Sequence, residues 1–187
     1  MRTLISLAHI SLDGFMADAK GNFNFIKFNQ ELADFTYPII KSVDTSVYGR
    51  ITYQLMEGYW PNIDDTSADV DEGAKSHARW YNGVNKIVAS RTLQSTKSNV
   101  RVVADDIVGA LRAEKEKEGG DIMIFASPTL THTLAAAGLV DEWRLTIQPV
   151  ALGGGLPLWK GARTDMQLRS SRTFETGVIA AHYATKR

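Results

Sequence analysis

The sequence predicts an α/β domain with a largely parallel central sheet flanked by helices and a C-terminal antiparallel hairpin. Apolar runs that suit strands alternate with helical patterns through the middle of the chain. One apolar run, Ile122–Phe125, lies between Gly119-Gly120 and Ser127-Pro128, which is typical of a central strand buried on both faces. Near the end of the chain, residues 166–174 and 177–185 form two extended segments, which predict the closing hairpin.

The composition fits one globular domain over residues 1–187 with a full core, since 44% of the residues are hydrophobic and 22% are charged. The 21 basic and 21 acidic residues give a formal net charge of zero. This balance disfavours nucleic acids and acidic membranes as partners, because both are bound through an excess of Lys and Arg. The chain has no cysteine, which excludes disulfides, thiolate nucleophiles and Cys-ligated metals.

The N-terminal residues 3–10 are expected to form the first strand. Their apolar pattern is broken by Ser6 and His9 and leads directly into a turn at Asp13-Gly14, which is unlike a signal peptide. No apolar run approaches the roughly 20 residues that a membrane span needs. We therefore expect a cytoplasmic protein without a membrane partner.

The other elements continue the alternation of strand and helix. Further strands are expected over residues 43–48, 86–89, 100–103 and 142–148. Helices are expected over residues 29–42, 50–56, 69–82, 106–117 and 128–138. Asn29 is expected to cap the first helix, Asp105 or Asp106 the fourth, and Pro38 is expected to kink or limit the first.

Two features of the C-terminal third bear on assembly and flexibility. The strict alternation of Glu142–Gln148 suggests an edge strand with one wetter face, and residues 152–159 are expected to form a flexible loop. This strand and the closing hairpin have enough apolar surface to pair two subunits. A homodimer is therefore expected.

Four turns carry residues suited to a phosphorylated ligand. Ser127 is expected to cap a helix that starts at Pro128, so that unpaired N–H groups point out of the sheet's carboxyl edge. The turn at residues 49–52 repeats this arrangement. Residues 90–92 offer a guanidinium and two hydroxyls, which suit the 2′-phosphate of NADPH. The glycines 153–155 allow close approach of the backbone, and each turn alone also suits an ordinary surface loop.

Six motifs in this order together resemble the dihydrofolate-reductase-like family. The resemblance covers nearly the whole chain, and the branch it is most similar to is the C-terminal reductase domain of the riboflavin-biosynthesis deaminase-reductase, with its stand-alone bacterial relatives. The motifs are Ser11-Leu12-Asp13-Gly14-Phe15-Met16-Ala17, Gly49-Arg50-Ile51-Thr52-Tyr53, Tyr59-Trp60-Pro61, Ser90-Arg91-Thr92, Ala137-Gly138-Leu139-Val140-Asp141-Glu142 and Pro149-Val150-Ala151-Leu152-Gly153-Gly154-Gly155-Leu156-Pro157-Leu158.

The resemblance implies NADPH as the cofactor. It places residues 12–17 beside the nicotinamide ring, residues 49–52 and 126–130 at the phosphates, and residues 90–92 at the adenosine 2′-phosphate. The cofactor-binding residues are then Leu12, Asp13, Gly14, Ala17, Gly49, Arg50, Thr52, Ser90, Arg91, Thr92, Ala126, Ser127, Pro128, Thr129 and Leu130. The family commonly has one or two glycines where Ala126 and Ser127 stand, and a Cβ there restricts close approach and positive φ.

Hydride transfer needs few catalytic side chains, because the cofactor supplies the reactive carbon and the protein supplies position and dryness. By the resemblance to dihydrofolate reductases, a carboxylate of the first helix donates a proton, and the candidates are Glu31 and Asp34. Asp13 is a third candidate, although an Asp before Gly also suits a simple turn. The expected substrate pocket contains Tyr59, Trp60, Gly153 and Gly154.

Other chemistries have no support in the sequence. The four histidines lack metal-ligand spacing, so no metal is expected, and there is no nucleophile elbow or Walker loop. The sequence therefore indicates an NADPH-dependent reductase of a small heterocyclic, pteridine- or pyrimidine-like, or carbonyl substrate. Two alternatives stay open: a non-catalytic nucleotide-binding or structural homodimer on the same fold, and a riboflavin-pathway reductase proper, although this chain has no deaminase domain.

Overall fold

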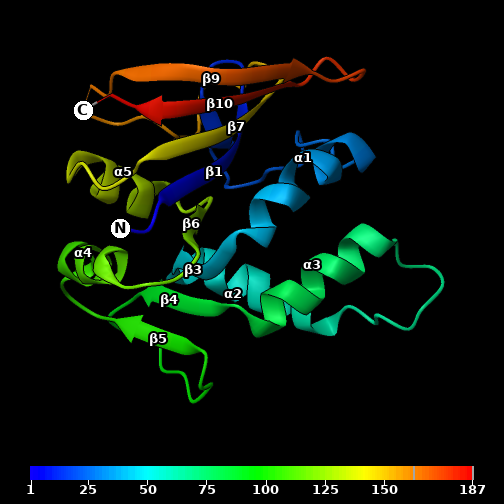
Figure 1. The fold of residues 1–187 in the computed structure, drawn as a ribbon. Helices are drawn as coiled ribbons and strands as arrows, with labels where there is room; N and C mark the ends of the chain where they lie inside the picture. The colour runs from blue at the N-terminus through cyan, green and yellow to red at the C-terminus, as the bar shows by residue number, and fades with distance from the viewer. Residues whose placement is uncertain (162, 187) are drawn as a thin grey trace.

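The computed structural model describes residues 1–161 and 163–186, in which one large sheet carries helices on both faces (Figure 1). The expected domain of residues 1–187 includes Ala162 and Arg187, which lie outside the described residues. The strands of this sheet are β1 (Leu4–Ser11), β3 (Val43–Gly49), β4 (Asn85–Ala89), β5 (Val100–Val103), β6 (Asp121–Phe125), β7 (Glu142–Gln148), β9 (Met166–Thr173) and β10 (Ile179–Thr185). Their order is β5-β4-β3-β6-β1-β7-β10-β9.

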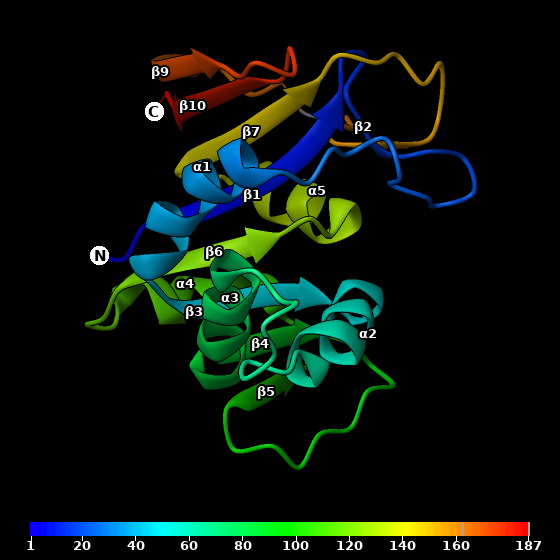
Figure 2. The ribbon, with the colours of Figure 1, turned by 90° about the vertical axis from the view of Figure 1, so that its right-hand side faces the viewer.

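The sheet is parallel from β5 to β7 and antiparallel beyond. Each neighbouring pair within β5-β4-β3-β6-β1-β7 is parallel. The strand β10 pairs antiparallel with both β7 and β9, which confirms the predicted hairpin. The carboxyl ends of the parallel strands therefore meet at one edge, which we call the carboxyl edge, and in Figure 2 the arrowheads of β1, β3 and β6 point toward it.

Helices cover both faces of the sheet. They are α1 (Gln30–Lys41), α2 (Arg50–Tyr59), α3 (Glu72–Gly83), α4 (Ile107–Glu116), α5 (Pro128–Ala136) and the short 3-10 helix η1 (Trp60–Asn62). The helices α1, α2 and α3 lie on one face, and α4 and α5 lie on the other (Figure 1). We expected Pro38 to kink or limit the first helix; it lies inside α1, which continues to Lys41, so it does not end the helix. Among the described residues, no helix has the length and apolar character needed to cross a bilayer.

Each face of the sheet packs a separate apolar core. On the face of α4 and α5, Val47 and Ile124 contact Leu130 and Leu134 in a cluster whose members are almost fully buried. On the face of α1 to α3, the strand residues pack against aromatic rings from α2 and α3, such as Tyr53. Burial on both faces explains why Ile122–Phe125 is a continuous apolar run, as the sequence predicted.

The prediction that Glu142–Gln148 is an edge strand is wrong. This strand, β7, lies between β1 and β10, and the two edges of the sheet are β5 and β9. The alternation of apolar and polar residues has another cause. Trp143 and Leu145 enter the core beneath α4 and α5, while the polar residues that alternate with them along β7 lie on the opposite face. Thr146 on that opposite face is also fully buried, so polarity in the sequence did not indicate exposure.

The predicted flexible loop of residues 152–159 is partly ordered into a strand. The pair Leu156–Pro157 forms β8, which pairs antiparallel with β2 (Phe15–Ala17) in a small second sheet. The backbones approach closely, since a Cβ added at Gly155 would lie 2.0 Å from the carbonyl oxygen of Ala17. Gly155 also has a φ of 144°, so glycine is required there for both reasons.

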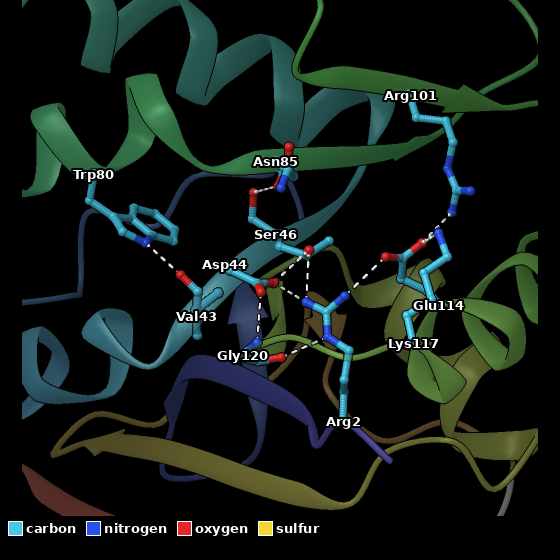
Figure 3. Close-up of polar contacts among 11 residues, drawn as sticks. Arg2, Val43, Asp44, Ser46, Trp80, Asn85, Arg101, Glu114, Lys117 and Gly120 are labelled. Atoms are coloured by element: carbon cyan, nitrogen blue, oxygen red, sulfur yellow. Dashed lines mark hydrogen bonds and ion pairs between the residues drawn. The ribbon is translucent and has the colours of Figure 1, made fainter.

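A buried arginine joins the elements at the opposite, amino edge of the sheet (Figure 3). Arg2 is 7% exposed, and its guanidinium donates to the carbonyl of Gly120 at 2.7 Å and to Thr45 Oγ1 at 2.8 Å. It also forms ion pairs with Glu114 at 3.0 Å and with Asp44. The start of β1 is thereby connected to β3 and α4.

Candidate functional site

The carboxyl edge has the topology that places ligand sites in open α/β sheets. The neighbouring strands β3 and β6 are followed by α2 and α5, and these helices pack on opposite faces of the sheet. A crevice between two such connections is where ligands bind in doubly wound sheets. The first turns of α2 and α5 both lie at the carboxyl edge, because each helix begins directly after its strand.

These two helices differ from the others in how they begin. Side chains of Asn29, Asp71 and Asp106 accept hydrogen bonds from the first turns of α1, α3 and α4 at 3.0, 2.9 and 2.8 Å. The N-cap positions of α2 and α5 are Gly49 and Ser127, and neither provides a side-chain cap. The N–H groups in the first turns of α2 and α5 therefore remain available to an anion.

Ser127 occupies the N-cap position that the sequence predicted, but its predicted capping role is wrong. Its hydroxyl instead accepts the backbone N–H of Gly49 at 3.0 Å, which joins the two helix starts. This contact depends on the side-by-side arrangement of β3 and β6, so the local sequence gives no sign of it. Among the described residues, the hydroxyl of Ser127 donates no hydrogen bond, so its hydrogen is left for a ligand.

Ala126 and Ser127 adopt the backbone conformation expected of glycine. Their φ angles are 46° and 53°, although a left-handed non-glycine residue costs about 1–2 kcal/mol. Thr131 stabilises this turn, because its N–H donates to the carbonyl of Ser127 at 2.9 Å and its hydroxyl donates to the carbonyl of Ala126 at 3.0 Å. The expected restriction on positive φ is therefore overcome by bonds from the first turn of α5.

The residues predicted to face the phosphates differ in their exposure. Arg50 is exposed on α2 and donates to Gln54 at 3.0 Å, and Thr52 is partly buried in the same turn. Thr129 is exposed, and Pro128 is partly buried as the first residue of α5. The side chain of Leu130 lies in the core, so only its backbone can face a ligand.

The turn after β4 presents an arginine to solvent. The hydroxyl of Ser90 accepts the N–H groups of Thr92 at 3.2 Å and Leu93 at 2.9 Å, so it shapes this turn. The Arg91 side chain is 80% exposed and lies 3.4 Å from Asp105. Since β4 is the neighbour of β3, this guanidinium extends the same carboxyl edge.

The segment predicted beside the nicotinamide contains an anchoring carboxylate. Asp13 accepts the hydroxyl of Ser11 at 2.6 Å and the N–H groups of Leu152 and Gly153 at 3.0 and 2.7 Å. These hydrogen bonds, first that of Ser11, lower the pKa of Asp13 to about 2. An ionised carboxylate with these partners favours an anchoring role over proton donation. Gly154, the neighbour of Gly153 in this loop, is partly buried.

The other residues predicted beside the nicotinamide differ in their exposure. Leu12 is 68% exposed, and its N–H donates to the carbonyl of Val150 at 2.7 Å. Gly14 has a φ of 88° and lies at the turn. Ala17 is buried in β2, so its side chain is directed away from solvent.

The structure does not bring the three candidate proton donors together. Glu31 accepts the N–H of Glu175 at 3.0 Å and lies 3.6 Å from Arg172, so it connects α1 to the β9-β10 turn. Asp34 accepts a hydrogen bond from Gln30 at 2.7 Å and lines a cavity of about 310 Å³ between α1 and α3. Asp13 lies at the turn after β1 instead.

The two predicted pocket aromatics have different surroundings. Tyr59 is 56% exposed at the end of α2. Trp60 stacks on His77 with ring centroids 3.8 Å apart, and its indole N–H donates to the sulfur of Met56 at 3.2 Å. Burial lowers the pKa of His77 to about 4, so this stack contains a neutral imidazole near neutral pH.

Sequence reasoning missed a chain of polar groups across β1 and β7. Nδ1 of His9 lies 2.6 Å from Oγ1 of Thr146, and the amide of Gln148 donates to the same hydroxyl at 3.3 Å. The backbone N–H of Lys27 donates to the other end of the Gln148 amide at 3.3 Å. Burial lowers the pKa of His9 to about 4. The signal in the sequence was a histidine that interrupts an apolar strand.

The chain belongs to the family of RibD C-terminal domains, whose profile matches residues 2–180. Among individual proteins, the chain is 30% identical to the uncharacterized protein YyaP of Bacillus subtilis, over 97% of this chain and 94% of that protein.

Similar solved structures show that the fold is dihydrofolate-reductase-like, as the sequence predicted. A putative riboflavin biosynthesis protein from Shewanella sp. PV-4 has a TM-score of 0.72 at 20% identity, covering 99% of both chains. Dihydrofolate reductase from Enterococcus faecalis, in complex with NADP(H), has a TM-score of 0.64 at 13% identity, covering 99% of this chain and 97% of the other.

Proposed function

We propose that the protein is an NADPH-dependent reductase that transfers a hydride to a small heterocyclic substrate of pteridine- or pyrimidine-like type, or to a carbonyl substrate. The observation that carries this proposal is the pair of uncapped helix starts at Gly49 and Ser127, joined across the carboxyl edge by their hydrogen bond. Unpaired N–H groups and two positive helix ends suit a pyrophosphate. Membership of the RibD C-terminal domain family supports the same function.

Exposed side chains along the carboxyl edge suit the other parts of NADPH. Arg91 and Thr92 suit the adenosine 2′-phosphate, and Arg50 suits the phosphates beside α2. The nicotinamide would then lie beside residues 12–17. NADPH supplies the hydride when bound, and the chain binds it, orients it and excludes water from the reacting face.

Tryptophan fluorescence during titration with NADPH and NADH tests this proposal. One of the four tryptophans, Trp159, lies beside the proposed nicotinamide site, since a Cβ at Gly14 would be 3.8 Å from its ring. We expect a saturable change with NADPH and weaker binding of NADH. Replacement of Arg91 by Ala should weaken NADPH binding about tenfold or more and leave NADH binding nearly unchanged, because the 2′-phosphate contact is lost.

The exposed Arg169→Ala on β9 is the matched control and should bind both cofactors as the wild type does. No saturable change with NADPH at millimolar concentration would contradict the proposed function. Equal weakening of both cofactors by Arg91→Ala would contradict the role assigned to this arginine.

A second candidate function is a non-catalytic nucleotide-binding or structural homodimer. The observation in its favour is that Asp13, Glu31 and Asp34 all hold structural hydrogen bonds. Saturable NADPH binding without oxidation across a broad panel of heterocyclic and carbonyl substrates would favour it. Both candidate functions include a homodimer located in the cytoplasm. A further alternative is that the substrate is an intermediate of riboflavin synthesis.

A further inference from the structure

His9 ends the polar chain across β1 and β7, on the face of the sheet covered by α1. Its ring is partly buried and meets Phe28 edge to face, with centroids 5.9 Å apart. We propose that Nε2–H of His9 is the hydrogen-bond donor that recognises a carbonyl oxygen of the heterocyclic substrate. This inference rests on the proposed reductase function and adds a substrate-binding residue to it.

The direction of the polar chain follows from its fixed end. The backbone N–H of Lys27 can only donate, so the group of Gln148 that faces it is the carbonyl oxygen. The NH₂ group of Gln148 therefore faces Thr146 and donates to its hydroxyl oxygen. The orientation of this amide is thus assigned by a backbone group.

The next link decides the tautomer of His9. Thr146 is fully buried, so its hydroxyl hydrogen needs an acceptor. Within residues 1–161 and 163–186, Nδ1 of His9 is the acceptor within hydrogen-bond distance of this hydroxyl. Nδ1 is then unprotonated, and the ring carries its single hydrogen on Nε2.

The remaining nitrogen is left for a ligand. In the part of the chain that the structure describes, Nε2 of His9 has no hydrogen-bond partner. His9 lies two residues before the end of β1, and the following residues 12–17 are proposed to adjoin the nicotinamide. Phe28 is 68% exposed beside it and offers an apolar ring to a flat heterocycle. A neutral imidazole that donates suits a carbonyl oxygen without introducing a charge.

The tautomer is tested by ¹⁵N NMR of histidine-labelled protein near neutral pH, without any ligand. We expect the His9 signals to show Nδ1 as the unprotonated, downfield nitrogen and Nε2 as the protonated one. The Thr146→Val variant keeps the shape of the side chain and should disturb this pattern. Protonation of Nδ1 in the wild type would overturn the proposal, whatever the protein does with NADPH.

Recognition is tested by calorimetric titration of the NADPH-loaded protein with two probes. The first, 5,6-diaminouracil, has two ring carbonyls, and the second, 2,4,5,6-tetraaminopyrimidine, has amino groups in their place. We expect the wild type to bind the first probe about tenfold or more tightly than the second. His9→Phe should remove this preference, and His9→Gln, which retains an N–H donor, should restore part of it.

Two outcomes of the titrations would overturn the role of His9. One is wild-type protein that shows no preference or binds neither probe. The other is a folded His9→Phe variant that retains the preference. Because NADPH binding is measured separately, failure of the cofactor site is distinguished from failure of this assignment. If His9→Phe does not fold, the Thr146→Val variant is titrated with the same two probes. An unchanged preference for 5,6-diaminouracil in this variant would also contradict the role of the polar chain in orienting His9.

Discussion

Ser127 shows how one side chain can replace the function of a glycine turn. Its backbone has a φ of 53°, and its hydroxyl accepts the N–H of Gly49 from the neighbouring strand. The sequence predicted that this turn faces a phosphate and that two side chains obstruct it. The compensating bonds from Gly49 and Thr131 come from outside the turn, so local pattern could not reveal them.

The hydroxyl of Ser127 is expected to stabilise the fold and the proposed cofactor site together. Ser127→Ala leaves the N–H of Gly49 without its partner, so the free energy of unfolding should fall by about 1–2 kcal/mol. NADPH binding should weaken as well. Urea unfolding and fluorescence titration measure the two effects.

A second buried serine provides the matched control. The hydroxyl of Ser6 is fully buried and has no hydrogen-bond partner among residues 1–161 and 163–186. Ser6→Ala should therefore leave stability unchanged or raise it. Equal loss of stability in Ser6→Ala and Ser127→Ala would mean that the bond to Gly49 contributes nothing specific.

At the scale of elements, Asp13 connects two loops at the carboxyl edge. It joins the turn after β1 to residues 152–153, next to the small sheet of β2 and β8. The turn at Asp13-Gly14 was predicted from the sequence, but residues 152–159 were predicted to form a flexible loop. Pairing of β2 with β8 joins segments about 140 residues apart, which periodicity within either segment cannot show.

Because Asp13 is titratable, we expect the hydrogen-exchange protection of residues 152–153 to depend on pH. The carboxyl titrates near its ordinary value of 3.8 when unfolded and near 2 when folded, so its stabilising contribution is complete above this range. The contribution is lost as the pH falls from about 4 toward 2. Hydrogen exchange at the amides of Leu152 and Gly153, corrected for intrinsic rates, should accelerate over that interval.

Asp13→Asn should accelerate exchange of these two amides already near neutral pH, because part of the acceptor is lost. Asp18 is the control: its pKa is also lowered by hydrogen bonds, first that of Asn22, but it holds a different turn. Asp18→Asn should leave residues 152–153 unaffected. Protection that is insensitive to Asp13→Asn would refute the anchoring role.

The periodicity of apolar residues explains which helices and strands could be predicted from the sequence. Periods of apolar residues placed every strand and helix of the main sheet within a few residues, because burial of one face repeats along a single segment. The same reasoning misplaced β7 at an edge. Polar side chains of β7 such as Thr146 are buried because they form hydrogen bonds with His9 of β1 and with Gln148, and the position of His9 beside them depends on tertiary contacts.

For the whole molecule, stability and the proposed function lie at opposite edges of the sheet. The Arg2 cluster closes the amino edge, and the uncapped starts of α2 and α5 lie at the carboxyl edge (Figures 2 and 3). Sequence order alone could not predict either assembly, because each depends on the arrangement of β1, β3 and β6 side by side. The resemblance to a family led us to expect residues 49–52 and 126–130 at the phosphates of one cofactor, which local patterns could not indicate.

This separation predicts a variant that affects stability without affecting ligand binding. Arg2→Ala removes the hydrogen bonds and ion pairs of the buried guanidinium, while Glu114 keeps its ion pairs with Arg101 and Lys117, so the free energy of unfolding should fall by about 2–3 kcal/mol. NADPH affinity of the folded protein should stay within about twofold of the wild type, since no contact is proposed there. Chemical denaturation and fluorescence titration test both parts.

The exposed pair of Arg163 and Asp165 provides the comparison, with side chains 86% and 59% exposed. Arg163→Ala should cost no more than about 1 kcal/mol, because solvent screens an exposed ion pair. A comparable small cost for Arg2→Ala would show that the cluster at the amino edge does not hold β1, β3 and α4 together.

The most direct test of the central claim is a crystal structure of the protein grown with saturating NADPH. We expect density for the cofactor along the carboxyl edge, with the pyrophosphate between the first turns of α2 and α5 and the 2′-phosphate at Arg91. Turns that stay free of cofactor at residues 49–52 and 126–130, or NADPH bound elsewhere on the molecule, would contradict it.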